Sequence, residues 1–522
     1  MNRGRTWITL VIGLLALGMA GRMHGDLIDL RVEHKLIPEV NVLDDADPWV
    51  RFVQVGLGAF RGILVDILWT RATRLQDEGK YFELVQLSQW ITKLEPRIPE
   101  VWAYHAWNMA YNISVLFNTP EERWRWVSNG IELLRNEGLH HNPDNAQLQW
   151  ELGWFYQHKI GMNLDDMHFF YKKYLAEEMS LLVPGFLNYE DYAGVPKTRA
   201  DLLKLPGIDT LLDRMKELGL VDGLDERNLT IEQFSRPELL QALSSDLGQQ
   251  VYRYLVVKRL KNKYGLDLEV MQVVDEKFGP FDWRLHQAQS VYWAYRGSRT
   301  ADKPQDVKLQ RMIFQSMASA FRSGSLEIID PDQPPRFSPN LMMLEKTLAA
   351  YEYALETHKG VSIENGHMNF LRDAVLITAQ YAQTRVSKQM FDLAQTHYPA
   401  MVNGRPYETF VLDEMIGEDV DVLSDADAVA RIEGFLYQSY VYIGAGSPGR
   451  AKGFAVIARK FYERYKATRA GTRTDIGSWA ELQVHPRKMA GQLFSYPEAK
   501  ERLDHGKLPS ELLSDAEEEQ AP

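Results

Sequence analysis

Several ionisable side chains with the chemistry of metal ligands or acid-base catalysts lie close together in the chain: His158, Asp165, Asp166 and His168. Imidazole nitrogens and carboxylate oxygens bind divalent transition metals and also transfer protons. On one continuous helix, His158 and Asp165 would share a face two turns apart, and Asp165 and His168 would be neighbours at i, i+3. However, Gly161 can interrupt such a helix, and the two aspartates are more simply explained as a cap on a helix beginning near residue 167. We therefore keep these residues as candidate polar sites and expect no metal ion or cofactor.

A second polar group lies at the start of a predicted long helix: Glu364, His367, Arg372 and Asp373. Glu364 and His367 could orient each other, and Arg372 could bind an anion or a carboxylate. The alternative is a capping and salt-bridge network where two helix pairs meet. The sequence favours this structural interpretation, so no catalytic residue is assigned.

Aromatic residues are concentrated in the N-terminal third, where nine of the 13 tryptophans lie between Trp49 and Trp154. In the predicted helix over 101–113 they occupy more than one face. This pattern is typical of a helix packed between two neighbours, because each aromatic face needs a partner. It also fits a concave aromatic surface for a peptide or glycan. The candidate residues for that surface are Trp102, Tyr104, Trp107, Tyr111 and Trp154.

The glycines Gly56, Gly58 and Gly62 imitate the spacing of a dinucleotide-binding loop, but no βαβ unit surrounds them. We instead predict one helix over about 48–76, in which Gly58 and Gly62 allow another backbone to approach closely. The chain also contains no phosphate-binding P-loop, no HExxH zinc motif and no GxSxG nucleophile elbow. The sequence therefore provides no complete catalytic motif.

The elements that position these residues are predicted to be helices, because apolar residues recur at three- to four-residue multiples from residue 48 to about 178. The predicted class is all-α. A more polar helical insertion or small domain follows over 195–280, and long helices resume afterwards, among them 341–358, 369–396, 425–442 and 447–467. The expected organisation is 1–25 signal peptide or membrane anchor, 26–47 tether, 48–194 first helical array, 195–280 insertion, 281–505 second array and 506–522 acidic tail.

Three stretches carry a repeated pattern at the start of a helix pair. Leu68, Gly79 and Tyr81 precede Pro96, Trp102 and Ala106 follow it, and Leu152-Gly153 with Tyr156 forms an L-G-x-x-Y signature. With these residues, positions 63 to about 175 resemble the tetratricopeptide-repeat family. The resemblance implies antiparallel helix pairs stacked as an α-solenoid. Two departures are Leu84 at the position of the second-helix alanine and the wide spacing of Pro96 and Pro143, which suggests an insertion over 118–122.

Other phrases are similar to those of an uncharacterised group of exported bacterial repeat proteins. They are the segments 106–112, 279–284 and 364–367. This second resemblance implies no particular activity.

The composition excludes several classes of function. The 522 residues carry a net charge of −12, which would repel a phosphate backbone, so a nucleic-acid partner is not expected. The absence of cysteine excludes disulfides, thiolate metal sites and cysteine nucleophiles.

The N-terminus has the outline of an export signal. Arg3 and Arg5 precede an uncharged apolar run from Trp7 to Ala20. Small residues at 18 and 20 fit cleavage after Ala20, while tilting and bilayer thinning would instead let the run serve as an anchor. Both outcomes place the chain outside the cytoplasm, either anchored in the inner membrane or free in the periplasm.

These features together favour an exported, membrane-associated scaffold that binds protein partners in the bacterial envelope, without a cofactor and without enzymatic activity. Two alternatives remain. One is an enzyme acting on an envelope glycan, since helical toroids and superhelices can carry carboxylate pairs beside aromatic platforms. The other is an accessory subunit of a transport or secretion complex.

Overall fold

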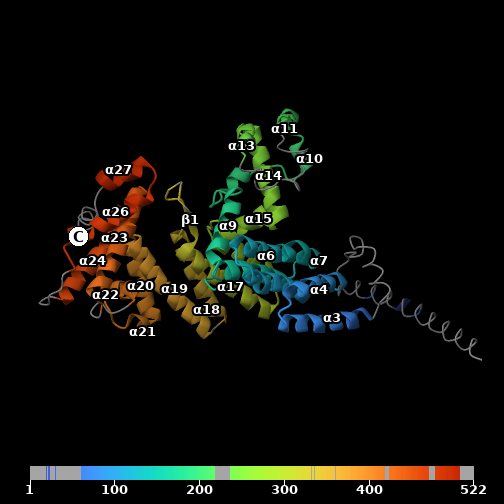
Figure 1. The fold of residues 1–522 in the computed structure, drawn as a ribbon, viewed down its shortest axis with the longest axis horizontal. Helices are drawn as coiled ribbons and strands as arrows, with labels where there is room; N and C mark the ends of the chain where they lie inside the picture. Colours follow the sequence, from blue (N-terminus) through green and yellow to red (C-terminus); the bar gives the residue numbers. More distant parts are fainter. Residues whose placement is uncertain are drawn as a thin grey trace, which may run out of the picture. The chain divides into compact units, whose positions relative to one another are not determined.

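The computed structural model describes residues 19, 22, 23, 30, 60–217, 236–330, 332, 333, 335–358, 360–417, 423–469 and 476–505. These residues are mostly helical, with one short two-stranded sheet (Figure 1), so the predicted all-α class is confirmed. The chain divides into two compact units between Leu148 and Gln149, within helix α8 (Ala146–Trp154). The predicted boundaries at 194 and 280 both fall inside the second unit.

The first unit contains the helices α3 (Phe60–Asp77), α4 (Tyr81–Leu94), α5 (Pro99–Trp107), η1 (Asn108–Ile113), η2 (Ser114–Leu116), α6 (Pro120–Glu132), η3 (Leu133–Gly138) and α7 (Leu139–His141). Gly79, at φ +71°, makes the turn from α3 to α4, a conformation that costs glycine little. Thr119 caps α6 by accepting the Glu122 N–H, and Pro120 occupies its first position. Apolar faces of α3, α4 and α5 form a core that includes Leu75, Leu84 and Ile91.

The wide spacing of Pro96 and Pro143 has a different cause from the predicted insertion over 118–122. Only Phe117, Asn118 and Thr119 separate η2 from α6, so this segment is a short turn. The helices before and after this turn continue through π-helical segments at Asn108–Ile113 and Leu133–Gly138. The predicted insertion over 118–122 is therefore a short turn that leads into the first residues of α6.

The second unit begins with η4 (Phe155–Ile160) and continues with a larger set of helices: α9 (His168–Ser180), η5 (Tyr189–Tyr192), α10 (Arg199–Leu202), α11 (Ile208–Glu217), α13 (Pro237–Ala242), α14 (Asp246–Tyr264), α15 (Leu268–Phe278), α16 (His286–Ser298), α17 (Lys303–Ser323), η6 (Leu341–Met343), α18 (Leu344–His358), α19 (Val361–Gln380), α20 (Thr384–His397), α21 (Pro399–Val402), α22 (Tyr407–Ile416), α23 (Asp425–Gly444), α24 (Pro448–Thr468), α25 (Trp479–Leu482), α26 (Val484–Leu493) and α27 (Pro497–His505). Separate apolar clusters lie between α19, α20 and α22, between α22, α23 and α24, and between α23, α26 and α27.

Local capping residues mark helix ends within the predicted insertion. Thr198 accepts the Asp201 N–H and caps α10, and Gly265, at φ +65°, ends α14. The segment from Pro237 to Tyr264 is two helices, because Ser245 caps a new helix by accepting the Gly248 N–H.

One element that the sequence did not predict is the antiparallel hairpin of β1 (Ser325–Glu327) and β2 (Arg336–Ser338). The proline-rich segment over 330–335 lies between its strands. Each strand has three residues, too few for an alternating pattern to be visible in the sequence.

Several predictions concern residues 1–59, of which the structure describes only 19, 22, 23 and 30. The export signal, the tether and the close packing proposed for Gly58 lie outside the described residues, as does the acidic tail over 506–522. The same proposal for Gly62 is wrong: a Cβ placed there would meet no described atom within 4 Å. Searching the described helices reveals none that combines the length and the hydropathy needed to cross a bilayer.

Candidate functional site

Two of the predicted aromatic surface residues are packed inside the first unit. Trp102 is buried, donates its indole Nε1–H to the Pro96 carbonyl oxygen over 2.8 Å, and stacks on His141. Tyr104 is half-buried and donates its hydroxyl to Gln76 Oε1 over 2.6 Å. Trp102 therefore serves packing, whereas the half-buried Tyr104 is tied to α3 by its hydroxyl.

Trp107 and Tyr111 remain accessible. They lie one helical turn apart where α5 becomes η1, and their rings stack at 5.4 Å with an interplanar angle of 18°. Trp107 is 38% exposed and Tyr111 is half-buried. Such a stacked pair can accept another flat group or an apolar side chain.

A more exposed aromatic group in the first unit was missed by the sequence analysis. Phe82 on α4, Phe117 after η2 and Trp126 on α6 have ring centroids 6.0 to 6.3 Å apart, and Phe82 is 54% exposed. Val115 and Leu116, beside Phe117 in the chain, are also about half exposed, at 47% and 50%. We call Phe82, Phe117 and Trp126 the aromatic patch. The available signal was the apolar run 115–117 placed directly before a polar turn.

In the second unit, Trp154 forms the centre of a stacked ladder. Its ring lies 5.3 Å from Trp150 and 4.5 Å from His158, with interplanar angles of 16° in both cases. The Lys308 ammonium lies 5.8 Å from the Trp150 ring centroid. Burial raises the pKa of the neighbouring Glu151 to about 7, although the charge of Lys308 opposes this shift. Glu151, which follows Trp150 in the chain, was not among the residues predicted from the sequence.

The first predicted polar group is divided among different environments. Gly161 ends η4 and residues 161–167 form turns, so His158, Asp165 and His168 do not share a helix face. His158 stacks on Trp154, Asp166 is exposed, and His168 Nδ1 lies 3.1 Å from Lys172 Nζ. Nowhere in the described ranges do three or more His, Asp or Glu side chains come together as a possible metal site.

Asp165 itself is part of a buried ion pair. Its Oδ2 lies 2.5 Å from Lys159 Nζ, and the two side chains are only 8% and 4% exposed. The Tyr171 hydroxyl also donates to Oδ2 over 3.2 Å, and the Met167 N–H donates to Oδ1 over 2.9 Å, just before α9 begins. Burial alone would raise the pKa of Asp165, but the hydrogen bonds from Lys159 and Met167 outweigh it and lower the pKa. The carboxylate therefore holds the turn before α9 in place.

The second predicted polar group also separates. His367 is buried, and its Nδ1 lies 2.9 Å from the Tyr398 hydroxyl, which takes the place of the predicted partner Glu364. Burial, assisted by the charge of His397, lowers the pKa of His367 to about 4, so its ring is neutral at neutral pH. Glu364 is exposed on the same helix.

Arg372 lies beside Asp373, and Asp373 Oδ2 also accepts a hydrogen bond from Arg322 Nη1 of α17 over 3.1 Å. These charges link α19 to α17. This arrangement matches the structural interpretation of the group as a salt-bridge network more closely than the catalytic one.

A feature suited to a small ligand lies in the second unit, between α9, the hairpin and helices α19, α23 and α24. It is a pocket of about 650 Å³. Its aromatic lining consists of Phe169, Phe170, Phe337, Tyr381, Tyr442 and Phe454. Lys173 and Arg336 also line it, together with Glu327. None of these residues was predicted, because they come from five elements far apart in the sequence.

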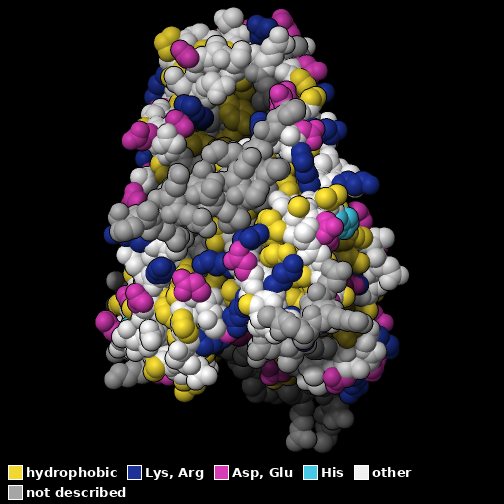
Figure 2. Space-filling model, turned by 90° about the vertical axis from the view of Figure 1, so that its left-hand side faces the viewer, with side chains coloured by type: hydrophobic (Ala, Val, Ile, Leu, Met, Phe, Trp, Pro, Cys, Tyr) yellow, Lys and Arg dark blue, Asp and Glu magenta, His cyan; other side chains and the backbone are white. Residues whose placement is uncertain are grey.

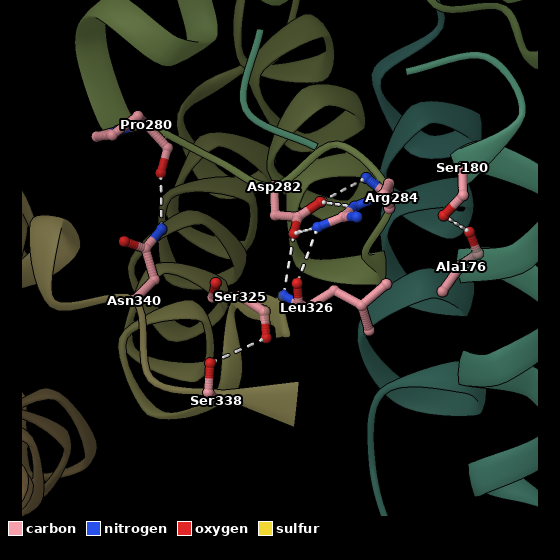
Figure 3. Close-up of polar contacts among 9 residues, drawn as sticks. All are labelled: Ala176, Ser180, Pro280, Asp282, Arg284, Ser325, Leu326, Ser338 and Asn340. Carbon is pink, nitrogen blue, oxygen red and sulfur yellow. Dashed lines mark hydrogen bonds and ion pairs between the residues drawn. The ribbon is translucent and has the colours of Figure 1, made fainter. Parts of the chain in front are cut away.

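The hairpin wall of this pocket is held by a buried charge (Figure 3). Both Asp282 oxygens contact Arg284, at 2.8 and 2.6 Å, and Oδ2 also accepts the Leu326 N–H over 3.0 Å. Arg284 donates in turn to the Leu326 carbonyl oxygen over 3.1 Å. Two residues after the other strand, Asn340 donates its side-chain amide to the Pro280 carbonyl oxygen over 2.8 Å. The short strands are thereby fixed to the segment that precedes α16.

The face on the side of the C-terminal helices carries mixed charge. Figure 2 views the molecule from the side where the C-terminal helices of Figure 1 lie, and the described Lys and Arg side chains on this face are interspersed with Asp and Glu.

Comparison of the chain with protein-family models, curated proteins and solved structures finds no match. The function must therefore be inferred from the residues and their geometry.

Proposed function

We propose that this protein is an exported, membrane-associated scaffold of the bacterial envelope that binds a protein partner through the aromatic patch of its first unit. The observation that carries the proposal is the exposure of Phe82, beside Phe117, Trp126 and the accessible residues Val115 and Leu116. Exposed apolar side chains gathered in one area are costly in water and commonly mark protein contact sites. Phenylalanine and tryptophan are enriched in such interfaces.

The scaffold is a TPR-like stack of helix pairs. Two contacts support this arrangement within the first unit. The Pro96 carbonyl oxygen accepts hydrogen bonds from Trp102 Nε1 and from Asn142 Nδ2, both over 2.8 Å, which ties the end of one helix pair to both ends of the next. A Cβ at Gly130 would lie 2.8 Å from the Ala106 carbonyl oxygen, so α6 and α5 pack closely at this point. Such stacking presents side chains on rigid helices, as a recognition surface requires.

Export rests on the charged and apolar N-terminal segment, with Arg3 and Arg5 before the run from Trp7 to Ala20. A reporter fused after Asp47 is expected to be active only outside the cytoplasm. Activity of a cytoplasmic reporter at this position would refute export. Sequencing the mature N-terminus then distinguishes an anchor from cleavage after Ala20.

Partner binding is tested by placing the photoreactive residue benzoylphenylalanine at position 82 or 117 in cells. Because it is itself aromatic, it preserves the character of the patch. The matched control is position 353, since Tyr353 is 59% exposed against 54% for Phe82 and lies in the second unit. We expect ultraviolet-dependent protein adducts from 82 and 117, absent from 353 and lost when Trp126→Ser is added. Adducts that are equal at all three positions, or that persist with Trp126→Ser, would refute the proposal.

A specific observation also favours the glycan-active enzyme as a second candidate. Glu151, with its pKa raised to about 7 by burial, follows Trp150 in the stacked ladder of Trp150, Trp154 and His158. Aromatic faces bind sugar rings, and a carboxyl group that is protonated near neutrality can donate a proton to a leaving oxygen. Hydrolysis of peptidoglycan or a surface polysaccharide by the wild-type protein, lost in Glu151→Gln, would support this alternative over the scaffold.

A further inference from the structure

We propose that the pocket between α9, the β1–β2 hairpin and helices α19, α23 and α24 binds an amphiphile made of one apolar chain and an anionic headgroup. This site is separate from the aromatic patch and lies entirely within the second unit. It adds a small-molecule ligand to the protein partner proposed above.

The pocket has the interior that an apolar chain requires. Tyr381, Tyr442 and Phe454 form buried parts of the lining, at 9%, 7% and 8% exposure. The hydroxyl groups of Tyr381 and Tyr442 form a hydrogen bond with each other over 3.1 Å. The volume of about 650 Å³ falls within the range of established ligand sites, roughly 300 to 1,000 Å³. A linear chain can therefore replace water against the aromatic and aliphatic part of the lining, which is the main source of affinity.

The charges around the pocket select the headgroup. Arg450 forms an ion pair with Glu327 and also lies over the Tyr381 ring, at 5.3 Å, so the one acidic residue of the lining is already neutralised. Two cationic lining residues remain, Lys173 and Arg336. Lys173 has only a loose pair with Glu177, at 3.7 Å between two side chains that are each about half exposed. The lining thus has an excess of positive charge, which favours a carboxylate or a phosphate over a neutral or cationic headgroup.

The pocket wall is fixed by contacts of its own. Phe337 belongs to a small core with Ala176, Leu285 and Leu326, and Asp282 and Arg284 hold the Leu326 backbone (Figure 3). A site with fixed walls loses little conformational entropy when a ligand enters. The pocket is therefore a preformed site.

A fatty carboxylate and a single-chain lipid phosphate share the required chemistry, so the experiment includes both. The full-length chain in its own membranes is labelled with a diazirine-bearing, alkyne-tagged hexadecanoate, and the labelled peptides are identified by mass spectrometry. The competitors have one chain length and different headgroups: dodecanoate, dodecyl phosphate, dodecanol and dodecyltrimethylammonium. We expect label on peptides containing residues 169–176 and 335–339, displaced by the two anions at concentrations about tenfold lower than dodecanol requires. The more potent anion identifies the source.

Two variants test the residues that carry the inference. Gln438→Trp fills the pocket from α23 and should reduce labelling at least about tenfold, while Ala430→Trp, at an exposed position on the same helix, is its matched control. Arg336→Glu should weaken dodecanoate and leave dodecanol unchanged, with Lys204→Glu as the control for charge. Thermal melting of each variant verifies that it is folded.

Three results would overturn the proposal: label confined to other peptides, equal displacement by dodecyltrimethylammonium and dodecanoate, or full labelling of Gln438→Trp. None of them affects the photo-crosslinking at positions 82 and 117. Failure of this inference is therefore distinguishable from failure of the proposed protein-binding function.

Discussion

Replacing Asp165 by asparagine is expected to destabilise the turn between η4 and α9 by about 3 to 5 kcal/mol. The Asp165 carboxylate faces Lys159 at 2.5 Å, and the two side chains are only 8% and 4% exposed. Asparagine can still accept one of the hydrogen bonds from Met167 and Tyr171, but it leaves the Lys159 ammonium buried without a counter-charge. A helix cap alone would be worth only about 0.5 to 2 kcal/mol, so the size of the effect separates the two roles.

Hydrogen exchange of peptides covering residues 155–180 in the full-length chain measures this change locally. At about 1.4 kcal/mol per decade, we expect protection to fall by roughly two to four decades in Asp165→Asn. The double variant Lys159→Met with Asp165→Leu should be more protected than either single charge-removing variant, since it removes both charges from the interior.

The effect should also depend on pH. The pKa of Asp165 is lowered in the folded chain, so its stabilising contribution is present above the unfolded value of about 3.9 and is lost as the pH falls through the lower, folded value. The difference between wild type and Asp165→Asn should be constant from about pH 5 to 8 and should close below about pH 4. A protection loss under tenfold, or single and double variants with additive effects, would refute the assignment of a buried ion pair.

The remaining predictions concern close packing, buried titratable groups and catalysis. Gly130→Val should lower the free energy of unfolding by about 1 to 3 kcal/mol in thermal melting, because its Cβ would lie 2.8 Å from the Ala106 carbonyl oxygen. Gly62→Ala should raise the free energy of unfolding by roughly 0.5 to 1 kcal/mol, because a Cβ there would meet no described atom within 4 Å. Burial lowers the pKa of His367 to about 4, so below about pH 6.5 the folded chain binds fewer protons than the unfolded chain. The free energy of unfolding should therefore fall as the pH falls from 6.5 toward 4. In melting curves, His367→Gln should reduce this pH dependence by about 3 kcal/mol. The raised pKa of Glu151, about 7, has the opposite sign, so Glu151→Gln should gain stability over wild type as the pH rises from about 4.5 to 7. Glu364→Gln, at an exposed position, should change stability by less than about 0.5 kcal/mol, and we expect no glycan hydrolysis by the wild type on a panel of peptidoglycan and surface polysaccharides.

Helical periodicity in the sequence was sufficient to predict the elements, and some of their ends, because caps and turn glycines act locally. Thr198 and Gly265 are examples of residues whose chemistry defines a helix end without help from the rest of the fold. The predicted helix over 369–396 is wrong for the opposite reason. The chain turns at Ala382, at φ +58°, where neither glycine nor proline gives a signal. Gly453 on α24 packs against the backbone of Gln380 and Ala382, so this break is a tertiary effect.

The candidate sites show the same division between local and distant causes. The high density of aromatic residues in the first unit was visible in the sequence, but their roles were not, since Trp102 and Phe82 differ only in what the fold places over them. The sequence grouped His158 with Asp165 because the two residues are close in the chain. In the fold, His158 stacks on Trp154, whereas Asp165 pairs with Lys159. The pocket could not be found at all, because its lining runs from Phe169 to Phe454 and exists only after α9 and α24 are brought together.

The two proposed binding surfaces belong to different compact units, so each can be altered without changing the residues of the other. A variant of the aromatic patch, such as Trp126→Ser, changes no lining residue of the pocket, and Gln438→Trp changes no residue of the patch. If the protein were only a scaffold, filling the pocket would leave partner adducts at positions 82 and 117 unchanged. If an amphiphile instead controls partner binding, Gln438→Trp should alter those adducts although it lies in the other unit. Measuring both readouts in both variants therefore separates a scaffold with an independent ligand from a scaffold whose partner binding responds to that ligand.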